Sequence, residues 1–317
     1  MHCTAEVPSA IDSNKVEEGK KTYTPNPARA PYNPKPLLDT TAHHISVIIR
    51  PGNGRVFDDR VSVNRVDLDD ETSLARCLVG QDVLIITLSP ESYAKQTSLI
   101  RAAAAARVQY IVPTEFGSDP THERLNREIG LAEMQKPFRA LIEELGVSSW
   151  IGVVNGLFFD FNVRNGFWGL DIRNRKVTFY DDGQVKINTS TLSWIAISLA
   201  RFFSMPDEFI RQHQNDWIYF SSFLVSQRDV FESAKRMTGT TEADWEVVCV
   251  NSKVAALEAK NCMEDGDHMA VFSLLFALTF QEGFGSDFSD RVIDYAAMGL
   301  SPPTLDTAVK GLVDNCI

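Results

Sequence analysis

Short runs of aliphatic and β-branched residues alternate with longer segments of helical periodicity through the first half of the chain. Five runs have the length and composition of strands: 45–49, 61–67, 82–88, 108–112 and 149–154. The unbroken apolar run at 82–88 is typical of a strand buried on both faces of a parallel sheet. Three intervening segments have the composition of helices: 69–78, 92–106 and 131–145. This alternation predicts an α/β fold with a Rossmann-like, doubly wound parallel sheet and right-handed crossovers.

Beyond residue 156 the pattern is less regular. Two β-prone runs, 177–180 and 185–187, flank the sequence Asp-Asp-Gly-Gln, which predicts a β-hairpin. The remaining predicted elements are a helix at 190–203, a strand at 217–220 and helices at 226–237 and 271–280. We therefore expect an NAD(P)-binding domain over 37–156 and a smaller α/β substrate-binding lobe over 157–317.

The first 36 residues differ in character from the rest of the chain. They are polar and then rich in proline, with prolines at positions 25, 27, 31, 34 and 36. Each proline removes a backbone donor and fixes φ, which excludes helix and central strand. Too few large apolar residues remain to offset the entropy of ordering. The composition predicts a disordered tail over residues 1–36.

Composition and net charge argue against nucleic acid as a binding partner. The chain has 317 residues, 44% of them hydrophobic, which is enough for the core of one or two domains. The net charge is −11 and the isoelectric point is about 5.1, whereas a phosphate-binding face needs clustered Lys and Arg. We expect no contact with nucleic acid.

Cysteine and histidine usage indicates neither disulfides nor metal. The five cysteines form no Cys-x-x-Cys pair, and the six histidines lack metal-binding spacing. Buried small hydrophobes in a reducing compartment are the simplest interpretation of these cysteines. Neither a signal-peptide core nor the roughly 20 apolar residues of a membrane span occurs. We expect a cytoplasmic protein without a metal ion or a membrane partner.

Residues that follow predicted strands carry the candidate chemistry, because ligands of open parallel sheets bind outside the carboxyl ends of the strands. Arg50 follows the first recognised strand, where a cation can pair with the 2′-phosphate of NADP; an exposed loop arginine is the alternative. Asp69 can contact an adenine edge or cap the next helix. Thr87 and Ser89 follow the buried strand where a dinucleotide would lie, although small polar residues also end strands in turns.

A second candidate group follows the strand at 108–112. In the run 113–119, Pro-Thr-Glu-Phe-Gly-Ser-Asp, a proline and a glycine bracket a polar–aromatic pair. Phe116 can stack on a nicotinamide ring there, or it can fill the core. Lys136 lies in the next predicted helix, beside Pro137. Its side chain is either solvated or able to hydrogen-bond the cofactor ribose and protonate a substrate carbonyl.

Five stretches together resemble the NmrA-like and isoflavone-reductase-like atypical short-chain dehydrogenases, with fungal members most similar: 45–50, 66–70, 83–87, 112–119 and 142–159. The resemblance covers about residues 37–310. Its more specific parts are the run at 113–119 and the Glu-Glu-Leu-Gly-Val-Ser-Ser-Trp-Ile stretch that leads to Asn155-Gly156.

This resemblance implies a two-lobed, NADP-preferring reductase with its active site between the lobes. It implies that Arg50 binds the 2′-phosphate, that Thr87 lies near the ribose and pyrophosphate, and that Phe116 lies beside the nicotinamide. Lys136 is within one residue of the family's catalytic lysine. Asn155 corresponds to the loop that lines the substrate cleft.

The chain departs from this family before residue 37. The family opens with a strand and a Gly-x-x-Gly-x-x-Gly loop, whose glycines let the backbone approach the pyrophosphate at a helix N-terminus. Here Gly19 is the only glycine before Gly52, and no strand is predicted ahead of it. We therefore expect an incomplete NAD(P)-binding domain without its central first strand, and an altered start of the sequence is the favoured explanation.

By analogy with the family that the chain resembles, we expect an NADP-dependent oxidoreductase that transfers hydride from NADPH to a carbonyl or activated double bond of a small aromatic or polyketide-like secondary metabolite. A cluster of aromatic residues either lines an apolar pocket or belongs to the core: Phe158, Phe159, Phe161, Phe167 and Trp168. The alternatives are a non-catalytic NmrA-like dinucleotide sensor that binds a regulatory partner, and an inactive truncated form. The sequence leaves the oligomeric state open.

Overall fold

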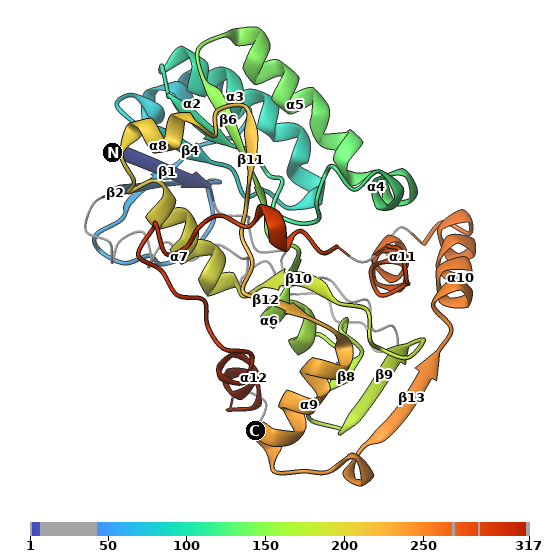
Figure 1. Ribbon diagram of the computed structural model, residues 1–317. Helices are drawn as coiled ribbons and strands as arrows, with labels where there is room; N and C mark the ends of the chain where they lie inside the picture. The colour runs from blue at the N-terminus through green and yellow to red at the C-terminus, as the bar shows by residue number, and fades with distance from the viewer. Residues whose placement is uncertain (1, 7–42, 268–269, 285, 315–317) are drawn as a thin grey trace. The chain divides into compact units, whose positions relative to one another are not determined.

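The computed structural model describes residues 2–6, 43–267, 270–284 and 286–314 (Figure 1). The chain forms two compact units whose segments interleave along the sequence. The first unit comprises Met1–Glu115, Gln135–Gly152 and Ala196–Trp217. The second unit comprises Phe116–Met134, Val153–Ile195 and Ile218–Ile317. The chain therefore passes between the units several times, whereas the sequence-based boundary at residue 156 divides it once.

A seven-stranded sheet in the order β11-β6-β5-β4-β1-β2-β3 organises the first unit. Its strands are β1 (His2–Glu6), β2 (His44–Ile49), β3 (Ser62–Arg65), β4 (Val83–Ile85), β5 (Tyr110–Val112), β6 (Ser149–Val154) and β11 (Asp216–Tyr219). Strands β1 to β6 pair in parallel. The order β3-β2-β1-β4 reverses direction between β1 and β4, as in dinucleotide-binding sheets. The predicted Rossmann-like class is confirmed.

Strand β1 corrects the expectation that the central first strand is missing. His2 pairs with His44 and Cys3 with both Ile45 and Val83, so β1 lies between β2 and β4. The prediction of a disordered tail is wrong for residues 2–6, and the rest of that tail, 7–36, lies outside the described residues. The segment His-Cys-Thr-Ala-Glu has little apolar signal, but its backbone can satisfy the two sheet edges that a central gap would leave unpaired.

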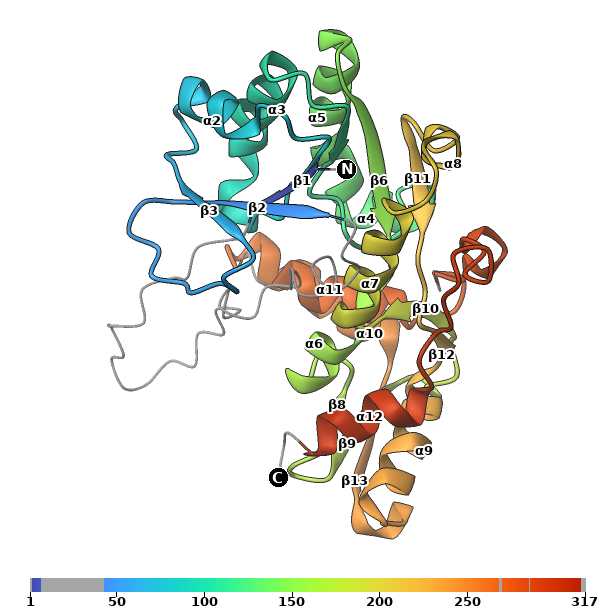
Figure 2. The ribbon, with the colours of Figure 1, turned by 90° about the vertical axis from the view of Figure 1, so that its left-hand side faces the viewer.

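Helices α2 (Glu71–Leu78), α3 (Gln96–Ala105) and α5 (Leu131–Leu145) pack through apolar side chains against one face of this sheet. Figure 2 shows the three helices together on that side. Side chains alternate along β5, so Ile111 joins this core while the Tyr110 ring lies 6.4 Å from that of Phe203, which follows α7 (Leu192–Phe202). Short α8 (Asp207–Arg211) also belongs to this unit.

Two three-stranded sheets organise the second unit, in the orders β12-β10-β7 and β13-β9-β8. Their strands are β7 (Leu157–Phe158), β8 (Leu170–Asp171), β9 (Lys176–Tyr180), β10 (Ile187–Ser190), β12 (Phe223–Val225) and β13 (Glu246–Val250). The accompanying helices are α4 (Glu123–Ile129), α6 (Phe159–Arg164), α9 (Gln227–Thr238), α10 (Ser252–Glu264), α11 (Ala270–Thr279) and α12 (Leu305–Asp314). One aromatic-rich core joins these elements.

The β-hairpin predicted around residues 181–184 does not form. Strand β9 pairs in parallel with β13 and antiparallel with β8, whereas β10 pairs with β12 and β7 in the other sheet. Asp181 and Gly183 have φ of 51° and 72°, as a tight turn would require. The Asp181 carboxylate, however, accepts hydrogen bonds from the Ser252 backbone N–H, at 2.9 Å, and from its hydroxyl. Pairing with a strand about 70 residues further on overrode the local turn signal.

No helix among the residues that the structure describes is both long enough and apolar enough to cross a membrane.

Candidate active site at the carboxyl edge of the parallel sheet

The carboxyl ends of the parallel strands bring four predicted site residues to one edge of the first unit. Arg50 directly follows β2 and is exposed. Asp69 lies between β3 and α2, and Thr87 and Ser89 follow β4 beside the switch point in strand order. Thr87 is buried, and Ser89 is the N-cap residue of the 3-10 turn Pro90–Lys95. In sheets of this topology the dinucleotide binds at this position.

The structure separates the two interpretations of the acidic pair at 69–70. Asp70 caps α2, since its carboxylate accepts a hydrogen bond of 3.0 Å from the backbone N–H of Ser73. Asp69 instead forms an exposed ion pair with Lys95, whose Nζ lies 2.5 and 2.6 Å from its two carboxylate oxygens. The capping role belongs to Asp70, and a contact between Asp69 and adenine stays a prediction.

Arg55 is a site candidate that the sequence interpretation missed. It lies in the same β2–β3 loop as Arg50, and its guanidinium carbon is 5.3 Å from the centre of the Phe57 ring. Its buried Nη1 has no hydrogen-bond partner within the described parts of the chain. Burial lowers the pKa of Arg55, because desolvation disfavours its charged form. A bound anion would supply an acceptor for Nη1. The available signal was a second basic residue after the Pro51-Gly52 turn.

Two buried polar contacts connect α5 to the exit of β5. Gln135 accepts a hydrogen bond of 3.1 Å from the Gln96 amide, and the Gln96 amide oxygen accepts one of 3.0 Å from the Thr114 backbone N–H. Arg139, three residues after the exposed Lys136, donates a hydrogen bond to Glu115. Thr114 and Glu115 are adjacent, so one strand exit holds α5 at two points.

The Glu115–Arg139 ion pair is almost fully enclosed. The two side chains are 6% and 9% exposed. The Arg139 guanidinium carbon lies 5.4 and 5.1 Å from the ring centres of Trp150 and Trp217, which suits a planar cation. Burial raises the pKa of Glu115 and outweighs the opposing effect of Arg139. Glu115 Oε1 has no hydrogen-bond partner in the described ranges.

The other two predicted site residues belong to the second unit. Phe116 is half-buried and Asn155 is fully buried. The backbone N–H groups of Asn155 and Gly156 donate to the Gly117 carbonyl at 3.1 and 3.0 Å, so the two loops lie together. Asn155 Nδ2 donates to the Gly156 carbonyl at 2.8 Å, whereas its Oδ1 is buried without a partner among described residues. Lys136, Arg50, Asp69, Thr87 and Ser89 are grouped in the first unit.

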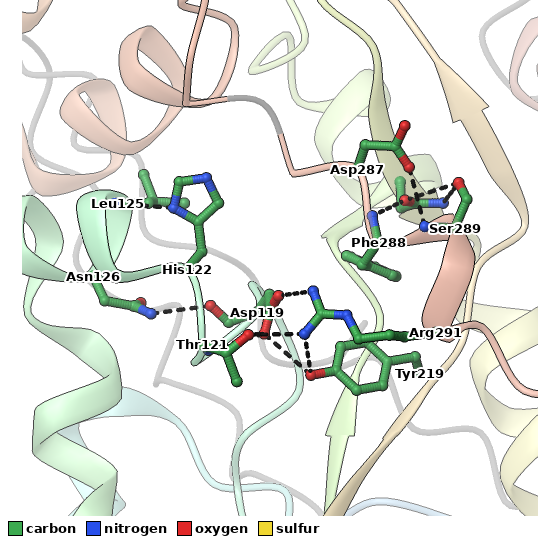
Figure 3. A network of polar contacts seen from close by, with 11 residues as sticks. Asp119, Thr121, His122, Leu125, Asn126, Tyr219, Asp287, Phe288, Ser289 and Arg291 are labelled. Carbon is green, nitrogen blue, oxygen red and sulfur yellow. Dashed lines mark hydrogen bonds and ion pairs between the residues drawn. The ribbon is translucent and has the colours of Figure 1, made fainter.

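A polar network in the second unit is centred on Asp119 (Figure 3). The buried Asp119 carboxylate accepts hydrogen bonds from the Thr121 backbone and hydroxyl at 2.9 and 2.8 Å, and from the Tyr219 hydroxyl at 3.2 Å. Arg291 forms an ion pair with Asp119 and donates to Thr121 and Tyr219 at 2.8 and 2.9 Å. The network ties the segment after β5 to the segment near residue 291. Its carboxylate is fully hydrogen-bonded, which indicates a structural role.

A pocket of about 360 Å³ lies in the second unit between β9, α11 and the loop before β8. Alternation along β9 turns Lys176, Thr178 and Tyr180 toward it, whereas the intervening Val177 and Phe179 are buried in the core. The Phe167 and Phe276 rings, stacked with centres 5.5 Å apart, form its apolar part. Burial raises the pKa of the Tyr180 phenol, which stays protonated as a hydrogen-bond donor.

The sequence allows the aromatic residues at 158–168 either to line a pocket or to belong to the core, and the structure distinguishes these roles for some of them. Phe167 lines the pocket. Phe159 and Trp168 belong to the core instead, 0% and 1% exposed, with their rings edge to face at 5.5 Å. The periodicity of the segment could not distinguish these roles, because both need apolar side chains.

Comparison with known proteins places these features in a class. No protein-family model matches the chain. Oxidoreductase aprR of Aspergillus flavus is 24% identical over 80% of this chain and 84% of its own length. Oxidoreductase poxI of Penicillium oxalicum is 24% identical over 78% of this chain and 77% of its own. The isoflavone reductase homolog A622 of Nicotiana glauca is 27% identical over 49% of this chain and 55% of its own.

Solved structures share the fold at low sequence identity. AtPrR2 with NADP+ and (+)-pinoresinol superposes with a TM-score of 0.69 at 17% identity, covering 88% of this chain and 94% of that one. A ternary complex of leucoanthocyanidin reductase from Vitis vinifera gives 0.69 at 15% identity, covering 99% and 100%. An isoflavone reductase gives 0.67 at 14% identity, covering 99% of each chain.

The fold and the relatives together define an NAD(P)-binding, Rossmann-type reductase class. Within it, the comparisons confirm the resemblance to the isoflavone-reductase-like, NmrA-like reductases, and the named relatives support an oxidoreductase.

Proposed function

We propose that this chain is an NADPH-dependent reductase that transfers hydride to a carbonyl or activated double bond of a small aromatic compound. The observation that carries the proposal is the strand order β3-β2-β1-β4 with two arginines, Arg50 and Arg55, in the loop after β2. In this topology that loop faces the adenosine ribose of the dinucleotide, where a cation selects the 2′-phosphate of NADP.

The residues of the first unit fit a dinucleotide at most of its groups. Arg50 and Arg55 would hold the 2′-phosphate, and the buried Nη1 of Arg55 would gain an acceptor, since it has none among the described residues. Thr87 and Ser89 would face the ribose and pyrophosphate, with Asp69 near the adenine. When bound, the nicotinamide supplies the hydride. Phe116 is the residue proposed to pack on that ring.

The pyrophosphate is the group that fits least well. Between β1 and β2 the sequence has a single glycine, Gly19, in place of the Gly-x-x-Gly-x-x-Gly loop. Backbone N–H groups at such a loop supply much of the phosphate contact in other dinucleotide sites. We therefore expect NADPH affinity to depend more strongly on the two arginines than it does where the loop is present.

Lys136 is the proposed catalytic residue. Its ammonium group would hydrogen-bond the ribose and donate a proton to the oxygen on which negative charge develops as hydride arrives. Asn155, whose buried Oδ1 has no hydrogen-bond partner among the described residues, is the proposed substrate-orienting residue of the second unit. Taken by itself, the pocket of that unit lined by Phe167, Phe276 and Tyr180 offers stacked rings and a phenolic donor, which suits a flat aromatic group with a polar substituent.

Cofactor titration tests the first part of the proposal. NADPH and NADH binding are measured by fluorescence for the parent protein and for Arg50→Ala and Arg55→Ala. Loss of a charge-assisted contact should weaken NADPH binding about 10- to 100-fold and leave NADH binding unchanged. Arg60→Ala is the matched control, because Arg60 is in the same loop and its exposed side chain pairs with Asp58. Equal binding of both cofactors by all four proteins would overturn the proposal.

Turnover tests the second part. NADPH oxidation is followed at 340 nm with a panel of aromatic aldehydes, quinones and α,β-unsaturated ketones. We expect Lys136→Met to lower kcat by about 100-fold or more while NADPH affinity stays within a few-fold. A second function, dinucleotide sensing without turnover, is favoured by the departure from the glycine-rich loop. Tight NADPH binding with no oxidation of any substrate would support the sensor.

A further inference from the structure

The helix α5 is weakest at the position of its proposed catalytic residue. Pro137 lies inside the helix and contributes no backbone donor. The ring of a proline also disfavours helical conformation at the residue before it, and that residue is Lys136. A lysine on a locally weakened helix has many accessible positions unless neighbouring contacts fix the backbone.

The two buried contacts flank this weak point. Gln135 immediately precedes Lys136 and is 6% exposed. Arg139 follows Lys136 by three residues, close to one helical turn, and its side chain is 9% exposed. Gln135 is bonded to Gln96 of α3 and Arg139 to Glu115 after β5, whereas Lys136 is exposed. Buried contacts on either side of Lys136 therefore hold the helix backbone in place.

Both contacts end on the exit of β5. Gln135 is held by Gln96, which in turn holds the Thr114 backbone, and Arg139 is held by Glu115. The Thr114 hydroxyl donates to the Ile86 carbonyl at 2.9 Å and accepts from the Leu88 backbone N–H at 3.2 Å. This chain of contacts continues to the exit of β4 on both sides of Thr87. The helix backbone at Lys136 is thus connected by hydrogen bonds to the same strand ends that carry the proposed cofactor site.

We infer that Gln135 and Arg139 are positioning residues for Lys136, acting through Gln96 and Glu115. This inference rests on the proposed function. Neither residue touches the reacting atoms. Their contribution is to hold the ammonium group where a proton can be delivered, since displacement by about 1 Å can cost a factor of 100 in rate.

The test uses a double variant, Glu115→Gln with Arg139→Met, because removing one member alone would leave an unpaired buried charge. We expect kcat to fall about 10- to 100-fold, while the KM and Kd for NADPH stay within twofold. Hydrogen exchange of the backbone over 131–140 should become faster. Arg139→Lys, which keeps the charge, should recover part of kcat.

The matched control lies on the same helix. Glu143 accepts a hydrogen bond of 2.7 Å from Trp150 Nε1, about two turns beyond Lys136. Glu143→Ala removes this anchor from the far side of Pro137. It should lower the melting temperature, as the loss of other part-buried hydrogen bonds does, yet leave kcat unchanged. An equal loss of kcat in Glu143→Ala would reduce the role of Arg139 to general stability and overturn the inference.

Coupling to Lys136 gives the decisive readout. In the parent, Lys136→Met should lower kcat about 100-fold or more; in the double variant it should lower kcat only a few-fold, because the lysine is already displaced. Additive effects would overturn the inference. The two proposals fail differently. A parent protein that does not oxidise NADPH overturns the proposed function and the inference with it, whereas turnover that the double variant leaves unchanged overturns the inference alone.

Discussion

Two ion pairs between a carboxylate and an arginine lie in different units, although their acidic residues are only four positions apart in the sequence. Glu115 pairs with Arg139 in the first unit, and Asp119 pairs with Arg291 in the second. The Asp119 carboxylate has further hydrogen bonds from Thr121 and Tyr219. In the Glu115–Arg139 pair the guanidinium lies against two tryptophan rings, and Glu115 has one oxygen without a partner among described residues.

This difference in hydrogen bonding indicates that the two pairs have different roles. Asp119 joins three residues through hydrogen bonds, so its removal breaks several contacts at once and costs folding energy. Glu115 is bonded to Arg139 alone among the hydrogen bonds of ordinary geometry within the described residues, and through Arg139 it holds helix α5 against the exit of β5. We therefore expect Asp119 to govern stability, and Glu115 to govern rate with a smaller effect on stability.

The largest expected effect comes from Asp119→Ala. It leaves the donors of Arg291, Tyr219 and Thr121 without their shared acceptor. The loss in the free energy of unfolding should be about 3 kcal/mol, at the lower end for a broken buried pair because Arg291 keeps contact with solvent. Urea unfolding measures it. Asp58→Ala, which breaks the exposed pair with Arg60, is the control and should cost less than about 1 kcal/mol.

Glu115→Gln should have a smaller effect that depends on pH, because the glutamine amide oxygen can still accept the hydrogen bond from Arg139 although the charge of Arg139 is no longer paired. The raised pKa means that folded Glu115 binds its proton more tightly than the unfolded chain, whose value is near 4.5. Protonation therefore stabilises the fold; this contribution is fully present below about pH 4.5 and is lost as pH rises through the raised pKa. Glutamine has no such dependence. The stability of the parent relative to Glu115→Gln should increase from pH 7 to pH 4. A constant difference would contradict the raised pKa.

Tyr219→Phe should have the smallest effect, about 1 kcal/mol at neutral pH, because Asp119 keeps its other donors. Burial, followed by the charge of Asp119, raises the pKa of Tyr219 from 10 to about 12. Because the fold favours the protonated phenol, its contribution is present below pH 10 and lost between about pH 10 and 12. Absorbance at 295 nm should show one tyrosine fewer titrating near pH 12 in the variant. Loss of a tyrosine that titrates near pH 10 would refute the buried hydrogen bond.

Much of the first unit could be predicted because its signals are local. The apolar run at 82–88 and the helical segments appear as β4, α2, α3 and α5, with bounds that differ by a few residues. The predicted helix at 92–106 begins with a 3-10 turn, Pro90–Lys95, before α3. Residues that follow parallel strands can be assigned to one edge from topology alone, which is how Arg50, Thr87 and Ser89 were found.

Other parts of the proposed site gave little local signal. Arg55 offered only a second basic residue after the Pro51-Gly52 turn, and it stands out because one buried nitrogen lacks a hydrogen-bond partner among the described residues. Gln96, Gln135 and Arg139 are ordinary helix residues in the sequence, and their importance comes from contacts with the exit of β5. The predicted roles of Lys136, Phe116 and Asn155 stay predictions until the cofactor and activity measurements are made.

The sequence by itself determined the alternation of strands and helices, the parallel sheet and the strand ends at which chemistry concentrates, because periodicity and turn residues act over a few positions. Tertiary structure decided that His2–Glu6 occupies the centre of the sheet and that β9 and β10 belong to different sheets. It also decided that Glu115 and Asp119 serve different units. These outcomes depend on backbone pairing and charge burial between segments far apart in the chain, which no local pattern records.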